Sequence, residues 1–132
     1  MTKKISVKTR SRTEFVNITS DVQKVVSESG VKSGVCCVYV PHTTAGVTIN
    51  EGADPSVVKD ILSTLNKQIP HNGNYLHMEG NSDAHIKTSL FGSSEMIIID
   101  GGKLMLGTWQ AIFFCEFDGA RSRKMSVKIM GE

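Results

Sequence analysis

Runs and alternations of apolar residues along the chain predict a protein built mainly from strands. Apolar and charged residues alternate near the N-terminus, whereas GVCCVYV (34–40) and most of LMLGTWQAIFFCEFDG (104–119) are continuously apolar. Alternation is typical of a strand with one wet face, and a short continuous run is typical of a strand buried on both faces. The segments predicted as strands are 3–10, 13–18, 34–40, 46–50, 95–100, 103–106, 108–117 and 123–130.

Helical spacing predicts a first helix over residues 20–29. A stripe of valines recurs there at the spacing of one helix face. Ser20, followed three residues later by Gln23, fits a capping box, and Gly30 fits the position just after the last turn.

A second and a third helix are predicted from their ends. Asp54 is a suitable N-cap, Pro55 fits the first helical position, and Pro70 ends the apolar spacing that follows. A shorter helix is predicted over 83–90, with Ser82 or Asp83 as its cap. Seven or eight strands with two or three helices indicate the α+β class, as a two-layer, mostly antiparallel β-sandwich.

Composition restricts the class of protein. With 132 residues the chain is predicted to form a single domain over residues 1–132. It has no apolar run near the roughly 20 residues that span a bilayer and no secretory leader pattern, so we expect a cytoplasmic protein without a membrane partner. A net charge of +2 and the absence of any known nucleic-acid-binding motif argue against a nucleic-acid partner. Its three cysteines lack metal or disulfide spacing and are expected to behave as small buried hydrophobes.

Polar residues next to buried strands mark a candidate site. His42 follows an apolar strand and a proline, and Glu51 ends the strand that returns from this turn, so we expect both to face one cavity. Arg121 and Arg123 flank a predicted hairpin turn, where they are either solvated or clamp a phosphate. Trp109 is expected in the core or at an interface.

His77 and His85 bracket an acidic loop that contains a glycine. If this loop makes one turn, the two imidazoles meet, with Glu79 or Asp83 near them. Imidazole and carboxylate together suit Zn²⁺, Mn²⁺ or Fe²⁺, whereas carboxylate-rich sites suit Mg²⁺. The spacing matches neither HExxH nor a zinc finger, so hydrogen-bonded turn residues explain it equally well.

Three long motifs carry a resemblance to a known family. The segments PHTTAGVTINE (41–51), HMEGNSDAHIKTSLFGSS (77–94) and LMLGTWQAIFFCEFDGARSR (104–123) resemble the YjbQ-like family, whose members are labelled secondary thiamine-phosphate synthases. The resemblance implies an (α+)β-sandwich, a homotrimer and a polar site. Ala120 departs from the proline that many relatives carry, and the segment before His85 varies among relatives, which leaves the role of Asp83 less secure.

The resemblance also implies an activity. Hydroxymethylpyrimidine is transferred from its diphosphate to thiazole phosphate, and pyrophosphate is released. This reaction is either the main activity or a weak side activity. The residues that it assigns to the site are His42, Glu51, His77, Asp83, His85, Gln110 and Arg121. We expect His42, Glu51, Gln110 and Arg121 to act in catalysis.

A divalent metal, Mg²⁺ for the synthase, is expected on a second set of residues, which are His77, His85, Asp83 and His42.

Two alternatives use the same residues. The first is a metal-dependent hydrolase, in which His42, His77 and His85 hold a Zn²⁺-like ion and Glu51 acts as base. The second is a non-enzymatic trimer that binds a small anion or a metal. In a homotrimer the sites are expected at subunit interfaces.

Overall fold

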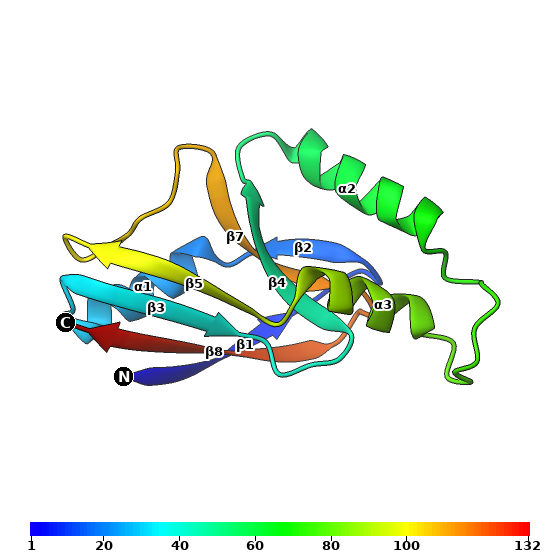
Figure 1. The fold of residues 1–132 in the computed structure, drawn as a ribbon, viewed down its shortest axis with the longest axis horizontal. Helices are drawn as coiled ribbons and strands as arrows, with labels where there is room; N and C mark the ends of the chain where they lie inside the picture. The colour runs from blue at the N-terminus through cyan, green and yellow to red at the C-terminus, as the bar shows by residue number, and fades with distance from the viewer.

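Two antiparallel sheets face each other in the computed structural model, which describes all 132 residues (Figure 1). The larger sheet has the strand order β1 (Thr2–Lys8), β8 (Ser122–Gly131), β3 (Ser33–Tyr39), β5 (Ser94–Asp100) and β6 (Lys103–Leu104). The smaller sheet has the order β2 (Glu14–Asn17), β7 (Gln110–Glu116) and β4 (Ala45–Glu51). The predicted α+β class and the two-layer β-sandwich are confirmed.

All three predicted helices are present, as α1 (Thr19–Ser29), α2 (Pro55–Gln68) and α3 (Ser82–Phe91). The carboxylate of Asp54 accepts a hydrogen bond from the Ser56 backbone N–H at 2.9 Å, as predicted for the N-cap of α2.

The start of α1 differs from the prediction. Its N-cap is Ile18, which makes no side-chain cap, so the predicted capping box of Ser20 and Gln23 is wrong. The Gln23 side chain instead bonds the backbone of Gly102 and Leu104, at 3.2 and 3.0 Å. These contacts tie α1 to the hairpin between β5 and β6, a partner that is distant in the sequence.

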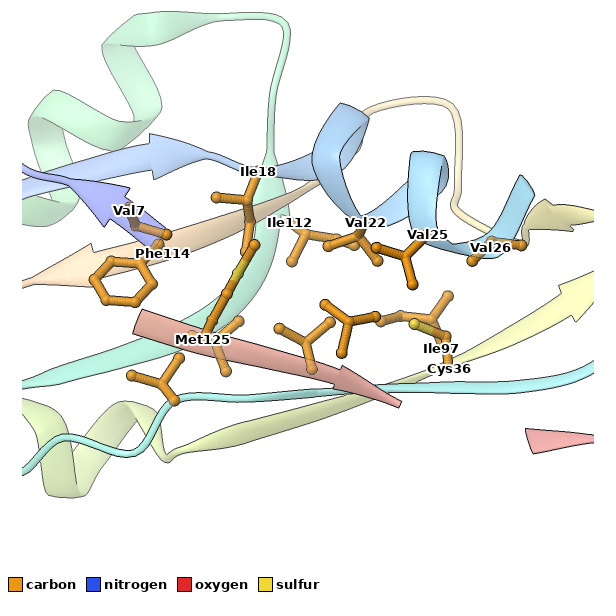
Figure 2. Packing of buried hydrophobic residues seen from close by; sticks show 14 of the residues in the cluster. Val7, Ile18, Val22, Val25, Val26, Cys36, Ile97, Ile112, Phe114 and Met125 are labelled. Carbon is orange, nitrogen blue, oxygen red and sulfur yellow. The ribbon is translucent and has the colours of Figure 1, made fainter. Parts of the chain in front are cut away.

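The main core lies between the two sheets and is closed on one side by α1. Figure 2 shows the valines of α1 pointing toward Cys36 and Ile97 of the larger sheet. Strand β7 is buried on both faces, because Ile112 and Phe114 belong to this core while Phe113 belongs to a second cluster under α2 and α3. The continuous apolar run of the sequence reflects this double burial.

The register of β4 on β7 decides which polar residues can meet. Ala45 lies opposite Glu116 at one end of the ladder, and Glu51 lies opposite Gln110 at the other. At about 3.4 Å per residue the two ends are about 20 Å apart. The beginnings of β4, α3 and β8 gather at one end of the molecule, away from both chain termini (Figure 1). No helix of the structure has the length and apolar character needed to cross a membrane.

Candidate functional site

A buried ion pair closes one end of the main core. Glu116 continues the inward row of β7 after Ile112 and Phe114, and Arg123 lies on the inward face of β8. Arg123 Nε donates to Glu116 Oε1 at 2.8 Å, and a terminal guanidinium nitrogen donates to Oε2. Both residues are almost completely buried, with 0% and 3% of their surface exposed.

Hydroxyl and backbone groups complete this ion pair. Thr9 donates to Glu116 Oε1 at 2.7 Å, the Asp118 backbone N–H donates to Oε2 at 3.0 Å, and Arg123 also donates to Thr44 Oγ1 at 2.8 Å. Burial by itself would raise the pKa of Glu116, but the hydrogen bonds from Arg123, Asp118 and Thr9 hold it below its ordinary value. Glu116 is therefore an ionised, fully satisfied carboxylate that fixes the neighbouring turn.

A polar cavity of about 370 Å³ lies beside the ion pair, where the beginnings of β4, α3 and β8 meet. None of its lining residues is a large hydrophobic one. The lining residues are Pro41, His42, Thr43, Thr44, Glu79, Asn81, His85, Asp118, Arg121 and Arg123. The cavity thus brings together three residues that the sequence predicted for the site: His42, His85 and Arg121.

His42 is fixed in the cavity wall by the backbone of β8. Its Nε2 accepts a hydrogen bond from the Lys124 N–H at 3.0 Å. Burial and the nearby Arg123 guanidinium lower the pKa of His42 below its ordinary 6.5. We therefore expect a neutral imidazole at pH 7.

Arg121 is held by one carboxylate and still has donors to spare. Its Nε donates to the Asp118 carbonyl at 2.9 Å, and a terminal nitrogen donates to Asp118 Oδ2 at 3.1 Å. Asn81 also donates to Asp118 Oδ2, at 2.9 Å. A guanidinium has five N–H donors, so Arg121, whose side chain is 50% exposed, has N–H groups left for an anion.

The predicted meeting of His77 and His85 is confirmed. Their rings are 5.4 Å apart, centre to centre, and nearly perpendicular. His77 Nε2 also lies 3.8 Å from a carboxylate oxygen of Glu79. His85 lines both the polar cavity and a neighbouring hollow, and His77 and Tyr75 line only that hollow.

Asp83 does not join these histidines as a free ligand. It is fully buried, accepts two hydrogen bonds from Arg12 at 3.1 Å each, and accepts a third from Lys87 at 2.9 Å. Burial opposes ionisation of Asp83, but the hydrogen bonds from Arg12 and Lys87 outweigh it and lower the pKa. Its role in the single chain is to anchor the first turn of α3.

The expected metal ligands do not converge in one chain. No group of three or more His, Cys, Asp or Glu residues is placed to hold a metal ion. Asp83 is engaged by two cations, and the Nε2 of His42 is engaged by Lys124. His77 and His85 are a close pair, but with Glu79 they do not make up a three-residue metal site.

Glu51 and Gln110 lie at the far end of the β4–β7 ladder, so the expectation that His42 and Glu51 face one cavity is wrong within a single chain. Glu51 caps the following turn through the Ala53 N–H at 2.9 Å, and Gln110 accepts from the Gly107 N–H at 2.8 Å. Trp109 beside them is 64% exposed, so it is not a core residue.

Glu116, Thr9 and Thr44 have no role in the site predicted from the sequence. Thr44 lines the cavity, whereas Glu116 and Thr9 lie behind the lining and reach it through their hydrogen bonds with Arg123 and Arg121. The one signal in the sequence is a glutamate inside an apolar run, in phase with Ile112 and Phe114. A carboxylate at such a position needs a partner, because burying it unpaired costs several kcal/mol.

Comparison with known proteins matches almost the whole sequence to one family. The family model described as "UPF0047 protein YjbQ-like" matches residues 3–132. A UPF0047 protein of Methanocaldococcus jannaschii is 58% identical over 98% of this chain and 94% of its own. UPF0047 protein YugU of Bacillus subtilis is 48% identical over 99% of this chain and 100% of its own.

Solved structures give the same result. The crystal structure of a conserved YjbQ/UPF0047 family protein from Clostridium acetobutylicum has a TM-score of 0.96 and 58% identity, and the match covers 97% of this chain and 99% of that one. A protein from Sulfolobus solfataricus has a TM-score of 0.96 at 34% identity, over 100% and 97% of the two chains. The chain therefore belongs to the YjbQ-like (UPF0047) family.

Proposed function

We propose that this protein is a transferase that acts on small phosphorylated substrates. In its most specific form, it joins hydroxymethylpyrimidine diphosphate to thiazole phosphate with release of pyrophosphate. One observation carries the proposal, namely that Arg121, His42 and His85 surround a cavity without a large hydrophobic lining residue. A guanidinium with unused donors beside two imidazoles suits a phosphate or pyrophosphate group.

The reaction needs groups that stabilise a leaving pyrophosphate, and the cavity contains such groups. The C–O bond between the pyrimidine methylene carbon and the diphosphate breaks, and its electron pair leaves with the pyrophosphate. The thiazole nitrogen supplies the electron pair of the new C–N bond, so no strong base is needed. Arg121 would stabilise the charge that develops on the leaving oxygens, and His85 would donate a hydrogen bond or a proton to them.

In this proposal a divalent cation binds together with pyrophosphate, and protein residues alone do not form its site. Mg²⁺ commonly keeps several waters and uses one or two carboxylates together with substrate phosphates. Glu79 lines the cavity and its side chain is 74% exposed, so its carboxylate is free to be such a ligand. Bound there, the cation would neutralise charge on the leaving group.

A homotrimer would explain why the expected site is divided. Glu51 and Gln110 lie about 20 Å from the cavity, at a surface where Trp109 is exposed. In a closed ring, this surface of one subunit would meet the cavity end of its neighbour. Exposed tryptophan is typical of interface hot spots. We therefore propose that Glu51 and Gln110 act in the site of an adjacent subunit.

Light scattering of the wild type and of Trp109→Glu and Trp109→Phe tests this arrangement. We expect a trimer for the wild type and Trp109→Phe, and smaller species for Trp109→Glu. A wild-type monomer with full activity would contradict the shared site.

The activity is tested by measuring thiamine phosphate formed from both phosphorylated precursors with Mg²⁺. We expect product with the wild type and a loss of about a hundredfold or more in Arg121→Ala, because a charge-stabilising donor contributes about 10²–10³ in rate. Arg10→Ala is the matched control, since Arg10 is exposed and lies outside the cavity lining. Equal product from wild type and Arg121→Ala would place the reaction elsewhere.

The contact between His77 and His85 keeps a metal-dependent hydrolase as the second candidate. In that case the wild type would retain a transition metal after purification and would lose hydrolytic activity with a chelator. A non-enzymatic anion-binding trimer would instead show stabilisation of about 2.7 kcal/mol at a hundredfold excess of ligand over Kd, without product. The hydrolase and the anion-binding trimer are alternative predictions. We also expect the protein to act in the cytoplasm.

A further inference from the structure

The hydrogen bond between Lys124 and His42 fixes which nitrogen of His42 carries its proton. A backbone N–H is always a donor, so Nε2 of His42, which lies 3.0 Å from the Lys124 nitrogen, must present a lone pair. In a neutral imidazole the proton then resides on Nδ1. Nδ1 has no hydrogen-bond partner within the protein, although His42 lines the polar cavity.

The surroundings of His42 favour this neutral form. Burial and the Arg123 guanidinium lower its pKa, and Arg121 acts in the same direction more weakly. Glu116 opposes them but is already paired with Arg123. A protonated Nε2 could not accept the Lys124 hydrogen bond, so charging the ring would also break this contact.

We propose that His42 is a neutral hydrogen-bond donor, whose Nδ1–H binds an anionic oxygen of a phosphate or pyrophosphate ligand. The inference rests on the proposed function, because it takes the polar cavity to be the anion site. It gives the catalytic role expected of His42 a specific form and argues against the role of His42 as a metal ligand. A neutral imidazole with its proton on Nδ1 has no lone pair there for a metal, and Nε2 is occupied.

The role has a chemical consequence for the cavity. Arg121 attracts the bound anion through its positive charge. His42 orients the anion through a directional hydrogen bond, without adding charge and without releasing a proton. A fixed donor of this kind needs no reorganisation when charge develops on the leaving oxygen. His42 would therefore stabilise the departing pyrophosphate, and any proton transfer would fall to His85, which also lines the cavity.

Long-range ¹⁵N–¹H correlation spectra of histidine-labelled wild-type protein at pH 7 test the tautomer directly. We expect the His42 spectrum to show a protonated Nδ1 and an unprotonated Nε2. On titration with inorganic pyrophosphate, we expect the Nδ1 resonance to shift while the tautomer stays the same. A proton on Nε2, a charged ring, or an Nδ1 that pyrophosphate leaves unchanged would overturn the proposal.

Two substitutions of His42 distinguish the role of its Nδ1 donor from that of its Nε2 acceptor. The amide nitrogen of Asn reaches the position of His Nδ1, whereas the amide of Gln reaches the position of Nε2. Calorimetric titration with pyrophosphate should show a loss of roughly ten- to a hundredfold in affinity for His42→Gln, because a hydrogen bond to a charged group contributes about 1.5–3 kcal/mol. His42→Asn should restore most of that affinity.

His71→Gln is the matched control, because His71 lies outside the cavity lining and contacts the Gly80 carbonyl instead. We expect its affinity for pyrophosphate to equal that of the wild type. Equal losses in His42→Gln and His42→Asn would contradict the donor role. Since these titrations measure binding without turnover, absence of synthase activity would reject the proposed reaction and leave this inference standing.

Discussion

Glu116 and Arg123 form a buried ion pair across the turn that joins β7 to β8. Each lies in the inward row of its strand, so the pair takes the place of an apolar contact at the end of the core. The same turn carries Asp118 and Arg121, which line the cavity. The ion pair therefore links the stability of the sandwich to the position of the groups that would bind an anion.

Replacing Glu116 by Gln should destabilise the protein by about 3–5 kcal/mol, because Arg123 would remain buried without a counter-charge. Denaturant unfolding at pH 7 measures this change. Glu28→Gln is the control, since Glu28 pairs with Lys3 at the exposed surface, where such pairs contribute at most about 1 kcal/mol. Similar small losses in both variants would show that the buried pair is not a stabilising contact.

The stability gained from Glu116 should depend on pH. Its pKa in the folded protein lies below the ordinary 4.5, so its contribution is present above about pH 4.5 and is lost as the pH falls through the folded-state pKa. The difference in unfolding free energy between wild type and Glu116→Gln should therefore stay constant from pH 7 to about 5 and shrink at lower pH. A difference that grows on acidification would reverse the assigned sign.

Asp83→Asn should lower stability without changing divalent-cation binding. The substitution leaves Lys87, only 1% exposed, without its carboxylate partner, and we expect a loss of several kcal/mol. Mg²⁺ and Zn²⁺ affinities, measured by calorimetry where the variant is folded, should match those of the wild type. Loss of metal affinity in Asp83→Asn, with Asp21→Asn unchanged as control, would restore Asp83 as a ligand.

Gly34→Ala should disrupt the contact between β3 and β8. A Cβ at this position would lie 2.1 Å from the Met130 carbonyl oxygen, and the ladder cannot yield as a side chain can. We expect a loss of about 2 kcal/mol or more in unfolding free energy. Gly131→Ala is the control, because the nearest neighbour of its Cβ would be a methyl group of the Val31 side chain, at 3.2 Å. Equal stability of the two variants would contradict the close approach of the strands.

The order and approximate bounds of the helices and strands follow from the sequence pattern alone. Period-two alternation, continuous apolar runs and residues such as Asp54 and Gly30 act over a few neighbouring positions, so helices and strands were predicted close to their observed bounds. Local chain geometry also explains why His77 and His85 meet, since one loop and the first turn of α3 connect them.

Tertiary structure alone decided which polar residues share a site. The register of β4 on β7 separates Glu51 from His42, although the two are nine positions apart in the chain. Burial with Arg12 and Lys87 converts Asp83 from an expected ligand into an anchor. The backbone of Lys124, 82 positions from His42, sets the tautomer of that ring. Strand register, long-range ion pairs and backbone donors depend on the packed fold, because no local sequence pattern specifies the partner that a polar group finds across a sheet.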